Sequence, residues 1–590
     1  MKKFLKYYFL LLLFCFSEKV FSQMATPASP KEIHVSTLGS DKNDGTPKDP
    51  VKTISQAVSR AFPGDIILVS GGVYRESVLF ERGGDSEINR ITLRAKEKQK
   101  VIIKGSDRQT GWQKKNDNIW ECMVDAIDSN ITLYFNGVKL IRVSKPGETR
   151  ESLKWTSEKS KRGLIIRANF GGENPNTGLS EIAIRDVGIS SKGSVDYITV
   201  EGISVSQIVN GPASIYGLQS GGINTNNGTH WKIANCVISE CKSVGVSIGV
   251  TGHAYQNISP RKPEFSDFTD ISSVGHHTVV KNHVYRCGQA GIFGFLGGSS
   301  SVIEDNLIEQ INEDNSYVGS ESGGIRLAMA VDATITHNLI REIHGDHGYG
   351  LYLGPIFQGT RISKNIISNT SSHLMYFFKN HGPVLVDNNV LAMPQRVAGA
   401  KEGVRMESSE ANVFVQNLFS NCYFSNGNQS GKPVSTSNFL PHSLVIKQTI
   451  PALNIDHRWY ANLFIGKGLS IPKSYGCESD YNAYLGGAHP SEWADANSIK
   501  TNDSPRFTLE HTPKGVDMNL ETELLRNIHI PELTSEYLGF FALSKQFVES
   551  PKGEKIKIDR DFFERKLKSS MRKPGPFSLN DKKKYHVKLF

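Results

Sequence analysis

The chain has 590 residues, of which 68 are Lys or Arg and 59 are Asp or Glu, so its formal net charge is +9. A charge this small for the length gives no reason to expect a nucleic-acid partner, although it would suit a polyanionic substrate. The 54 glycines follow no collagen period, and such chains are typical of β-solenoids, whose tight corners need positive φ angles.

The first 22 residues have the pattern of a secretory signal peptide. Lysines at the start precede an apolar run over 7–16, and Val20-Phe21-Ser22 offers small residues at the usual cleavage positions. No later apolar run is long enough to span a bilayer. We therefore expect an exported protein, periplasmic or extracellular, that has no membrane contact after cleavage.

The next two regions differ in pattern. Residues 23–109 alternate strands and turns with one helix at about 51–61, which predicts the N-terminal cap and first coils of a solenoid. Residues 110–193 carry alternating apolar and polar positions, for example over 131–135 and 164–168, and predict an inserted β-sandwich.

Residues 194–485 contain a recurrent Asn followed by two apolar residues. The copies begin at Asn306, Asn338, Asn365, Asn389, Asn417 and Asn462, with variants at Cys236 and His283. Stacked Asn side chains can form a ladder that satisfies the backbone groups of a turn. The pattern predicts an all-β protein, a right-handed parallel β-helix whose body over 194–485 carries the active-site face. Residues 486–590 form a C-terminal extension that ends either in a solvated tail or in a strand returning to the sandwich.

The cysteines and acidic residues give no metal motif. Six cysteines follow the signal peptide without a Cys-x-x-Cys pair, so zinc is not expected, and both a disulfide and buried free thiols remain open. A β-helix lyase can use Ca²⁺, but no oxygen-ligand loop is specific enough to support it. We expect no cofactor.

Several stretches spread over most of the mature chain carry the motifs of one enzyme family: 168–175, 196–200, 287–290 with 296–298, 358–365, 381–383 and 440–443. With these motifs the chain resembles glycoside hydrolase family 120, the β-xylosidase-type β-helix enzymes. The resemblance implies the β-helix, the sandwich insertion and a sugar substrate.

The two catalytic carboxylates that the resemblance implies are absent. The family's nucleophile motif matches 350–354, where its Asp is Gly354, and its acid/base motif matches 375–383, where its Glu is Phe378. Retaining hydrolysis needs one carboxyl group to attack and another to protonate, and neither residue can do so. The family thus predicts a sugar ligand, while these positions argue against its reaction.

Aligning successive coils predicts which outward side chains stack. One row contains Phe293, Arg326, Tyr352 and Tyr376, and the neighbouring row contains Phe295, Ala328, Gly354 and Phe378. The second row has lost its charge and predicts an apolar shelf, on which Phe295 and Phe378 would contact sugar rings.

The remaining polar residues suit β-elimination on an acidic, uronate-containing saccharide, whether or not it carries sulfate. Arg326 would neutralise the carboxylate, and Tyr352, Tyr376, His347, Lys379 and His381 would transfer protons. A sugar leaving group would make the enzyme a lyase, and a terminal hydroxyl would make it a dehydratase. The candidate binding residues are Glu321, Phe295, Phe378, Arg405, His442 and His457.

Two other classes of function remain open. A glycosidase with relocated carboxylates would use Glu321, Asp332, Asp346 or Glu402, and a non-catalytic protein would bind sugar on the apolar shelf. The site residues also have structural alternatives. The tyrosines could be an ordinary aromatic stack, Arg326 could pair with Glu321, and His381 could position its turn.

Overall fold

The computed structural model describes residues 30–590 except 117, 126–129, 216, 251–270, 395–402, 428–433, 494–495, 502–504, 514, 522–529, 569–571, 579–583 and 589–590. The predicted signal peptide and Glu402 lie outside the described residues. No helix within the described ranges is long and apolar enough to cross a bilayer.

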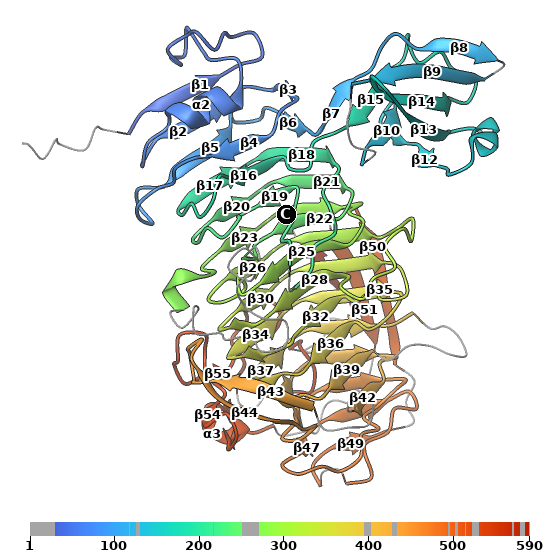
Figure 1. Cartoon of the computed structure of the whole chain (residues 1–590). Helices are drawn as coiled ribbons and strands as arrows, with labels where there is room; N and C mark the ends of the chain where they lie inside the picture. The colour runs from blue at the N-terminus through green and yellow to red at the C-terminus, as the bar shows by residue number, and fades with distance from the viewer. Residues whose placement is uncertain are drawn as a thin grey trace, which may run out of the picture.

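Three long parallel sheets wind around one core and confirm the predicted β-helix (Figure 1). The front sheet contains β4 (Val78–Phe80), β16 (Ile189–Ser191), β19 (Ile223–Asn224), β22 (Val244–Ser247), β25 (Ala290–Phe295), β28 (Gly323–Ala328), β32 (Leu351–Leu353), β36 (Met375–Phe378), β39 (Val404–Glu407) and β42 (Phe424–Gly427).

The left sheet contains β1 (Glu32–Val35), β2 (Ile66–Val69), β5 (Ile91–Ala95), β17 (Ile198–Glu201), β20 (Lys232–Ala234), β23 (Thr278–Val280), β26 (Val302–Glu304), β30 (Thr334–Thr336), β34 (Thr360–Ser363), β37 (His381–Asp387), β40 (Glu410–Val415), β45 (Arg458–Tyr460) and β47 (Glu478–Asp480).

The right sheet contains β3 (Gly72–Tyr74), β6 (Val101–Lys104), β18 (Ile203–Ile208), β21 (Val237–Cys241), β24 (His283–Tyr285), β27 (Leu307–Ile311), β31 (Leu339–Ile343), β35 (Ile366–Thr370), β38 (Val390–Ala392), β41 (Leu418–Ser420), β46 (Leu463–Ile465), β48 (Ala483–Leu485) and β49 (Ile499–Lys500).

The recurrent asparagines form the predicted ladder at the corner between the left and right sheets. Asn338 Nδ2 donates to Asn365 Oδ1 at 2.9 Å, and Asn365 Nδ2 donates to Asn389 Oδ1 at 2.9 Å. The backbone N–H of Asn338 donates to the same Asn365 oxygen at 3.0 Å. Since these side chains are buried, the ladder satisfies turn amides that water cannot reach.

A short helix covers the N-terminal end of the core. α2 (Ile54–Arg60) is shorter than the predicted 51–61, because Thr53 caps it by accepting a hydrogen bond from the N–H of Gln56. Ile54, Ala57 and Val58 face the core and keep water from the first coil.

The inserted sandwich projects from the second turn of the β-helix (Figure 1). It runs from β7 (Ser106–Arg108) to β15 (Ser180–Ala183), and β16 returns to the front sheet, so the insertion spans 106–183 and not the predicted 110–193. Its core includes Trp155 and Phe170. One layer adds β10 (Thr132–Phe135) and β11 (Val138–Lys139), and the other contains β8 (Gln113–Asn116), β9 (Ile119–Val124), β12 (Ile141–Arg142), β13 (Lys154–Ser160) and β14 (Gly163–Asn169).

The C-terminal extension packs on the β-helix. β56 (Lys584–Lys588) pairs with β51 (Gly515–Glu521), which pairs with β50 (Arg506–Thr512), so the last strand does not return to the sandwich. Apolar side chains of β51 cover a Leu-rich row of the right sheet, and this buried area explains the difference. The six described cysteines are buried free thiols.

Shorter elements complete the described chain. They are α3 (Ser535–Leu538), the 3-10 helices η2 (Pro146–Arg150) and η4 (Ile271–Ser273), and the pairs β29 (Ala330–Val331) with β33 (Phe357–Gln358), β43 (Val434–Phe439) with β44 (Ile446–Ala452), β52 (Leu533–Thr534) with β55 (Lys557–Ile558), and β53 (Phe540–Phe541) with β54 (Gln546–Phe547).

Candidate active site on the front sheet

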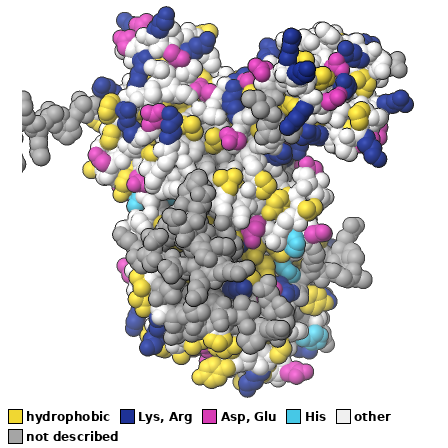
Figure 2. Space-filling model, viewed as in Figure 1, with side chains coloured by type: hydrophobic (Ala, Val, Ile, Leu, Met, Phe, Trp, Pro, Cys, Tyr) yellow, Lys and Arg dark blue, Asp and Glu magenta, His cyan; other side chains and the backbone are white. Residues whose placement is uncertain are grey.

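The front sheet has the register that the aligned coils predicted. Arg326 pairs with Tyr352, and Tyr352 pairs with Tyr376. One coil further, Tyr376 pairs with Arg405 and Phe378 pairs with Glu407. The two outward rows therefore continue into a cation and a carboxylate. On this face apolar side chains lie beside acidic and histidine side chains (Figure 2).

Five rings form one group, here called the aromatic cluster: Tyr349, Tyr352, His373, Tyr376 and Phe378. The Tyr352 and Tyr376 rings stack with centroids 4.7 Å apart, and Tyr349 meets Tyr352 edge-on at 5.1 Å. Phe378 packs on both stacked rings and stays partly exposed. The other four rings are buried, so Phe378 is the ring that can meet the C–H face of a sugar.

Arg326 lies beneath this cluster and supports it. Its side chain is 0% exposed, and its guanidinium carbon lies 3.7 Å from the Tyr352 ring centroid. Nε donates to Glu321 at 2.7 Å, and Nη1 donates to the carbonyls of Leu327 and Gly354. The guanidinium therefore pairs with Glu321, as the alternative predicted, while Nη2 is buried without a partner among the described residues. In this structure its burial keeps it from a ligand carboxylate.

Glu407 is the carboxylate nearest to the Phe378 position along its row. Its Oε2 accepts hydrogen bonds from Tyr376 Oη at 2.9 Å and from Arg405 Nε at 3.0 Å. Burial, the neighbouring Tyr352 and the Glu407 charge raise the pKa of Tyr376 far above its usual value. The Glu407 side chain is buried, while Arg405 is partly exposed at the edge of the cluster.

His347 and Tyr349 form a hydrogen-bonded pair at the other edge of the cluster. His347 Nδ1 lies 2.9 Å from Tyr349 Oη, and the direction of the bond depends on the imidazole tautomer. Burial raises the pKa of Tyr349 to about 12 although the Arg405 charge opposes this shift. At neutral pH the phenol is therefore protonated and can donate.

Lys379 follows Phe378 and lies over its ring, with Nζ 4.8 Å from the centroid. Burial lowers the pKa of Lys379, and the Glu407 charge opposes that shift. Within the described chain its Nζ makes no hydrogen bond or ion pair, so this cation can meet an anionic ligand.

Four residues proposed from the sequence lie away from the cluster surface. Phe295 is buried beside Phe439 and Leu444, so it cannot form part of an exposed shelf. His381 is fully buried and pairs with Glu410 at 3.0 Å, which ties it to the turn rather than to solvent.

The other two histidines serve packing. His442 contacts Asp332 through Nδ1 at 2.9 Å and Glu549 through Nε2 at 3.1 Å, and so joins the β-helix to the C-terminal extension. These carboxylates, Asp332 first, raise the pKa of His442 to about 9 against the effect of burial. His457 is fully buried, and burial lowers its pKa to about 3.

Gly354 cannot be replaced by a carboxylate without moving the backbone. Its φ is +127°, and a Cβ atom there would lie 1.9 Å from the carbonyl oxygen of Phe378. The backbone of this coil therefore excludes an acidic side chain at Gly354.

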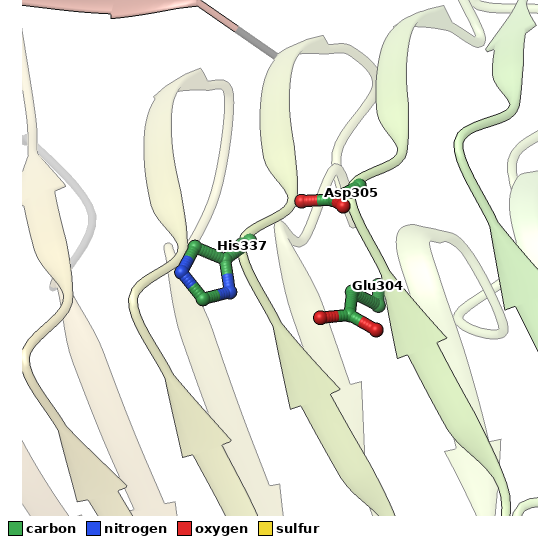
Figure 3. A group of neighbouring side chains, drawn as sticks. All are labelled: Glu304, Asp305 and His337. Atoms are coloured by element: carbon green, nitrogen blue, oxygen red, sulfur yellow. The ribbon is translucent and has the colours of Figure 1, made fainter. Parts of the chain in front are cut away.

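One group in the described chain could hold a metal ion, and it lies outside the front sheet. Glu304, Asp305 and His337 present ligand atoms within 4.8 Å of one another at the end of β26 and the turn after β30 (Figure 3). Burial and the Asp305 charge raise the pKa of Glu304, and burial lowers the pKa of His337. Two carboxylates and an imidazole are suitable ligands for a divalent cation.

The sequence argument missed Tyr349 and His373. Both belong to the cluster, and their rings stack at 5.7 Å and 7°. The signal was available, because the spacing that pairs Tyr352 with Tyr376 also places Tyr349 beside His373. Both residues lie just before the aligned strands, so an alignment of the strand residues did not include them.

Comparisons with known proteins agree with the fold and the predicted resemblance. Residues 221–391 match the family model "Right handed beta helix region". The solved structure "The complex structure of XylC with xylose" is 27% identical, has a TM-score of 0.83 and covers 95% of this chain and 100% of that chain. The match confirms the resemblance to the glycoside hydrolase family 120 β-helix proteins.

A second solved structure adds only the fold. A structure described as "Glycoside hydrolase" is 14% identical with a TM-score of 0.51, covering 68% of this chain and 95% of that chain. "Uncharacterized protein YwoF" of Bacillus subtilis (strain 168) is 33% identical over 73 residues, which span 12% of this chain and 15% of that protein.

Proposed function

We propose that this chain, whose fold and motifs resemble glycoside hydrolase family 120 over most of its length, is a carbohydrate-active enzyme. The similarity to XylC, solved with xylose, supports a saccharide ligand. In the aromatic cluster, the partly exposed Phe378 offers a ring on which a sugar can stack. Its two polar edges, His347 with Tyr349 and Arg405 with Glu407, supply proton-transfer and charged groups beside that surface.

The reaction we propose is β-elimination on a uronate. A base removes the C5 proton, the C4–O4 bond breaks with its electron pair moving to O4, and a C4=C5 double bond forms. O4 takes a proton from an acid. When O4 belongs to a glycosidic bond the enzyme is a lyase, and when it is a terminal hydroxyl the enzyme is a dehydratase that releases water.

The hydrogen bond between His347 and Tyr349 carries this proposal. If His347 Nδ1–H donates to Tyr349, Nε2 keeps a lone pair and serves as the base. Burial raises the pKa values of Tyr349 and Tyr352, which suits these phenols as donors to O4 and not as bases. Tyr376 contacts Glu407 and holds the stack in place.

Lys379 takes the role first assigned to Arg326. Its amine meets no described partner and lies beside the exposed edge of Phe378, where it can neutralise the uronate carboxylate and acidify the C5–H. Arg405, partly exposed and paired with Glu407, forms the second cationic contact.

A glycosidase is the second candidate, favoured by the similarity to XylC. Glu321 and Glu407 would be its carboxylates. Their backbones lie on coils three apart, about 14 Å, and the side chains would have to narrow that gap to the roughly 5 to 10 Å that hydrolysis needs. Each carboxylate also accepts a hydrogen bond from an arginine. The spacing therefore ranks hydrolysis below elimination, and a non-catalytic sugar-binding protein is the third candidate.

The test follows the ultraviolet absorbance of an unsaturated uronate while the purified protein acts on uronate-containing oligosaccharides. We expect a rise that His347→Gln and Tyr349→Phe reduce about 100-fold or more and that the control Tyr475→Phe, at a 78% exposed position, leaves unchanged. Product mass separates a lyase from a dehydratase. Reducing sugar without absorbance, lost in Glu321→Gln or Glu407→Gln, would establish a hydrolase. Binding without any turnover would establish a binding protein.

A further inference from the structure

A groove lies on the right sheet. It runs between the outward face of that sheet and β50, and it holds about 520 Å³. Its floor and rim come from β35, β38, β41 and β46, and its far wall comes from Phe507, Leu509 and His511. None of the residues placed in the aromatic cluster lines it.

The groove exists because three successive outward side chains are small. In the right sheet, Arg341 pairs with Ser368, Ser368 with Ala392, and Ala392 with Ser420. Larger residues follow at each end of this row, Arg341 before it and Ile465 after it. The parallel Leu-rich row is filled by β51, so the space stays open only above the small residues.

The described lining is neutral and divided into polar and apolar parts. It contains no Lys, Arg, Asp or Glu. Ser368 and Ser420 bring hydroxyls to the floor, and Asn369 and Asn421 bring amides to the rim. Phe507 and Leu509 alternate with exposed residues along β50 and turn their apolar sides to the groove. Ser368 Oγ lies 3.2 Å from His511 Nε2, which closes one end.

We propose that this groove binds a neutral oligosaccharide. A ring can stack its C–H face on Phe507 while its hydroxyls meet the serines and amides of the opposite side. An anionic ligand would meet no cation in the described lining, and a purely apolar ligand would remove water from the polar floor and rim without replacing its hydrogen bonds. The volume is within the range of small-ligand sites, and the three small residues form a floor about 10 Å long.

This assignment goes beyond the proposed function and does not depend on it. The candidate active site offers Lys379, Arg405 and acidic partners, whereas the right-sheet groove offers no described charge. The two sites therefore select different sugars, and a substrate that carries both uronate and neutral units could occupy both.

The experiment uses the full mature chain and three probes: xylotetraose, cellotetraose and mannotetraose. Calorimetric titration should detect at least one of them. Phe507→Ala should weaken its binding about tenfold, and Ala392→Arg, which fills the middle of the floor, should abolish it. Glu510→Ala, an exposed change on the same strand, should leave the affinity unchanged.

Two readouts separate this proposal from the elimination chemistry. Circular dichroism melting checks that each variant is folded, and the uronate absorbance assay should give the same rate for Phe507→Ala and wild type. Absence of binding to all three probes would overturn the groove assignment. So would binding that persists in both groove variants, or that is lost in Tyr352→Phe, because the sugar would then occupy the front sheet.

Discussion

The asparagine ladder and the aromatic cluster belong to neighbouring parts of the same coils and follow opposite rules. Along the ladder, Asn338, Asn365 and Asn389 repeat one side chain in one geometry. Along the front sheet the same coils carry Arg326, Tyr352 and Tyr376, and each side chain has different partners. The row that repeats one side chain stabilises the solenoid, and the row whose side chains differ contains the residues that can do chemistry.

The physical cause of the difference is the environment of each row. A buried amide is satisfied when the next coil presents the same amide, so any other residue leaves polar groups without partners. An outward row has no such requirement, because water or a ligand can satisfy what a neighbour does not. The following changes test this comparison, beginning with the largest expected effect.

Asn365→Asp should break the ladder. The carboxylate cannot donate to Asn389 or to the carbonyls of Ile335 and Ser363, and it would place a charge in a fully buried turn. We expect the free energy of unfolding to fall by more than about 3 kcal/mol, measured by urea denaturation. Asn369→Asp, an exposed position of the same coil, is the control and should change little.

If Asn365→Asp and Asn369→Asp lowered the free energy of unfolding equally, the ladder would not be the feature that stabilises the solenoid.

Gly354→Asp restores the family's acidic residue and should not restore hydrolysis. The new Cβ would clash with the Phe378 carbonyl at a φ of +127°, so we expect a loss of about 2 to 3 kcal/mol in stability. Gly487→Asp is the matched control, since its φ is also positive but nothing lies within 4 Å. A stable Gly354→Asp protein that releases xylose would contradict this account of the coil.

Tyr349→Phe should leave the fold intact and reduce turnover. The ring and its packing remain, while the hydrogen bond to His347 is lost. We expect a fall of about 100-fold in kcat on a uronate substrate, with the melting temperature close to wild type. A lower melting temperature with unchanged kcat would place Tyr349 with the structural residues.

His442→Gln should give a pH-dependent loss of stability. The pKa of His442 rises from 6.5 to about 9 in the fold, so its contribution is complete below pH 6.5 and disappears as the pH rises through 9. The difference in unfolding free energy between wild type and variant should be about 2 kcal/mol near pH 6 and should shrink toward pH 10. The exposed His489→Gln should show no such trend.

If the difference in unfolding free energy between wild type and His442→Gln grew with pH, the ion pairs of His442 would not stabilise the fold.

Much of the architecture could be predicted from the chain alone. The spacing of the asparagines predicted the β-helix, and the alternating pattern predicted a sandwich over 110–193, where the structure has the strands of the insertion over 106–183. The outward rows were also predicted in register, because parallel coils place residues of equal offset side by side. The absence of the two family carboxylates was evident without any coordinates.

The tertiary structure decided which of those outward residues can meet a ligand. Arg326 and Phe295 belong to the predicted rows, yet neighbouring loops and strands bury them. His442 was separated from its partners Asp332 and Glu549 by 110 and 107 positions, so no local pattern could have paired them. Sequence periodicity determines the position of a side chain along a coil, whereas its exposure and charge partners depend on segments that pack against the coil from elsewhere in the chain.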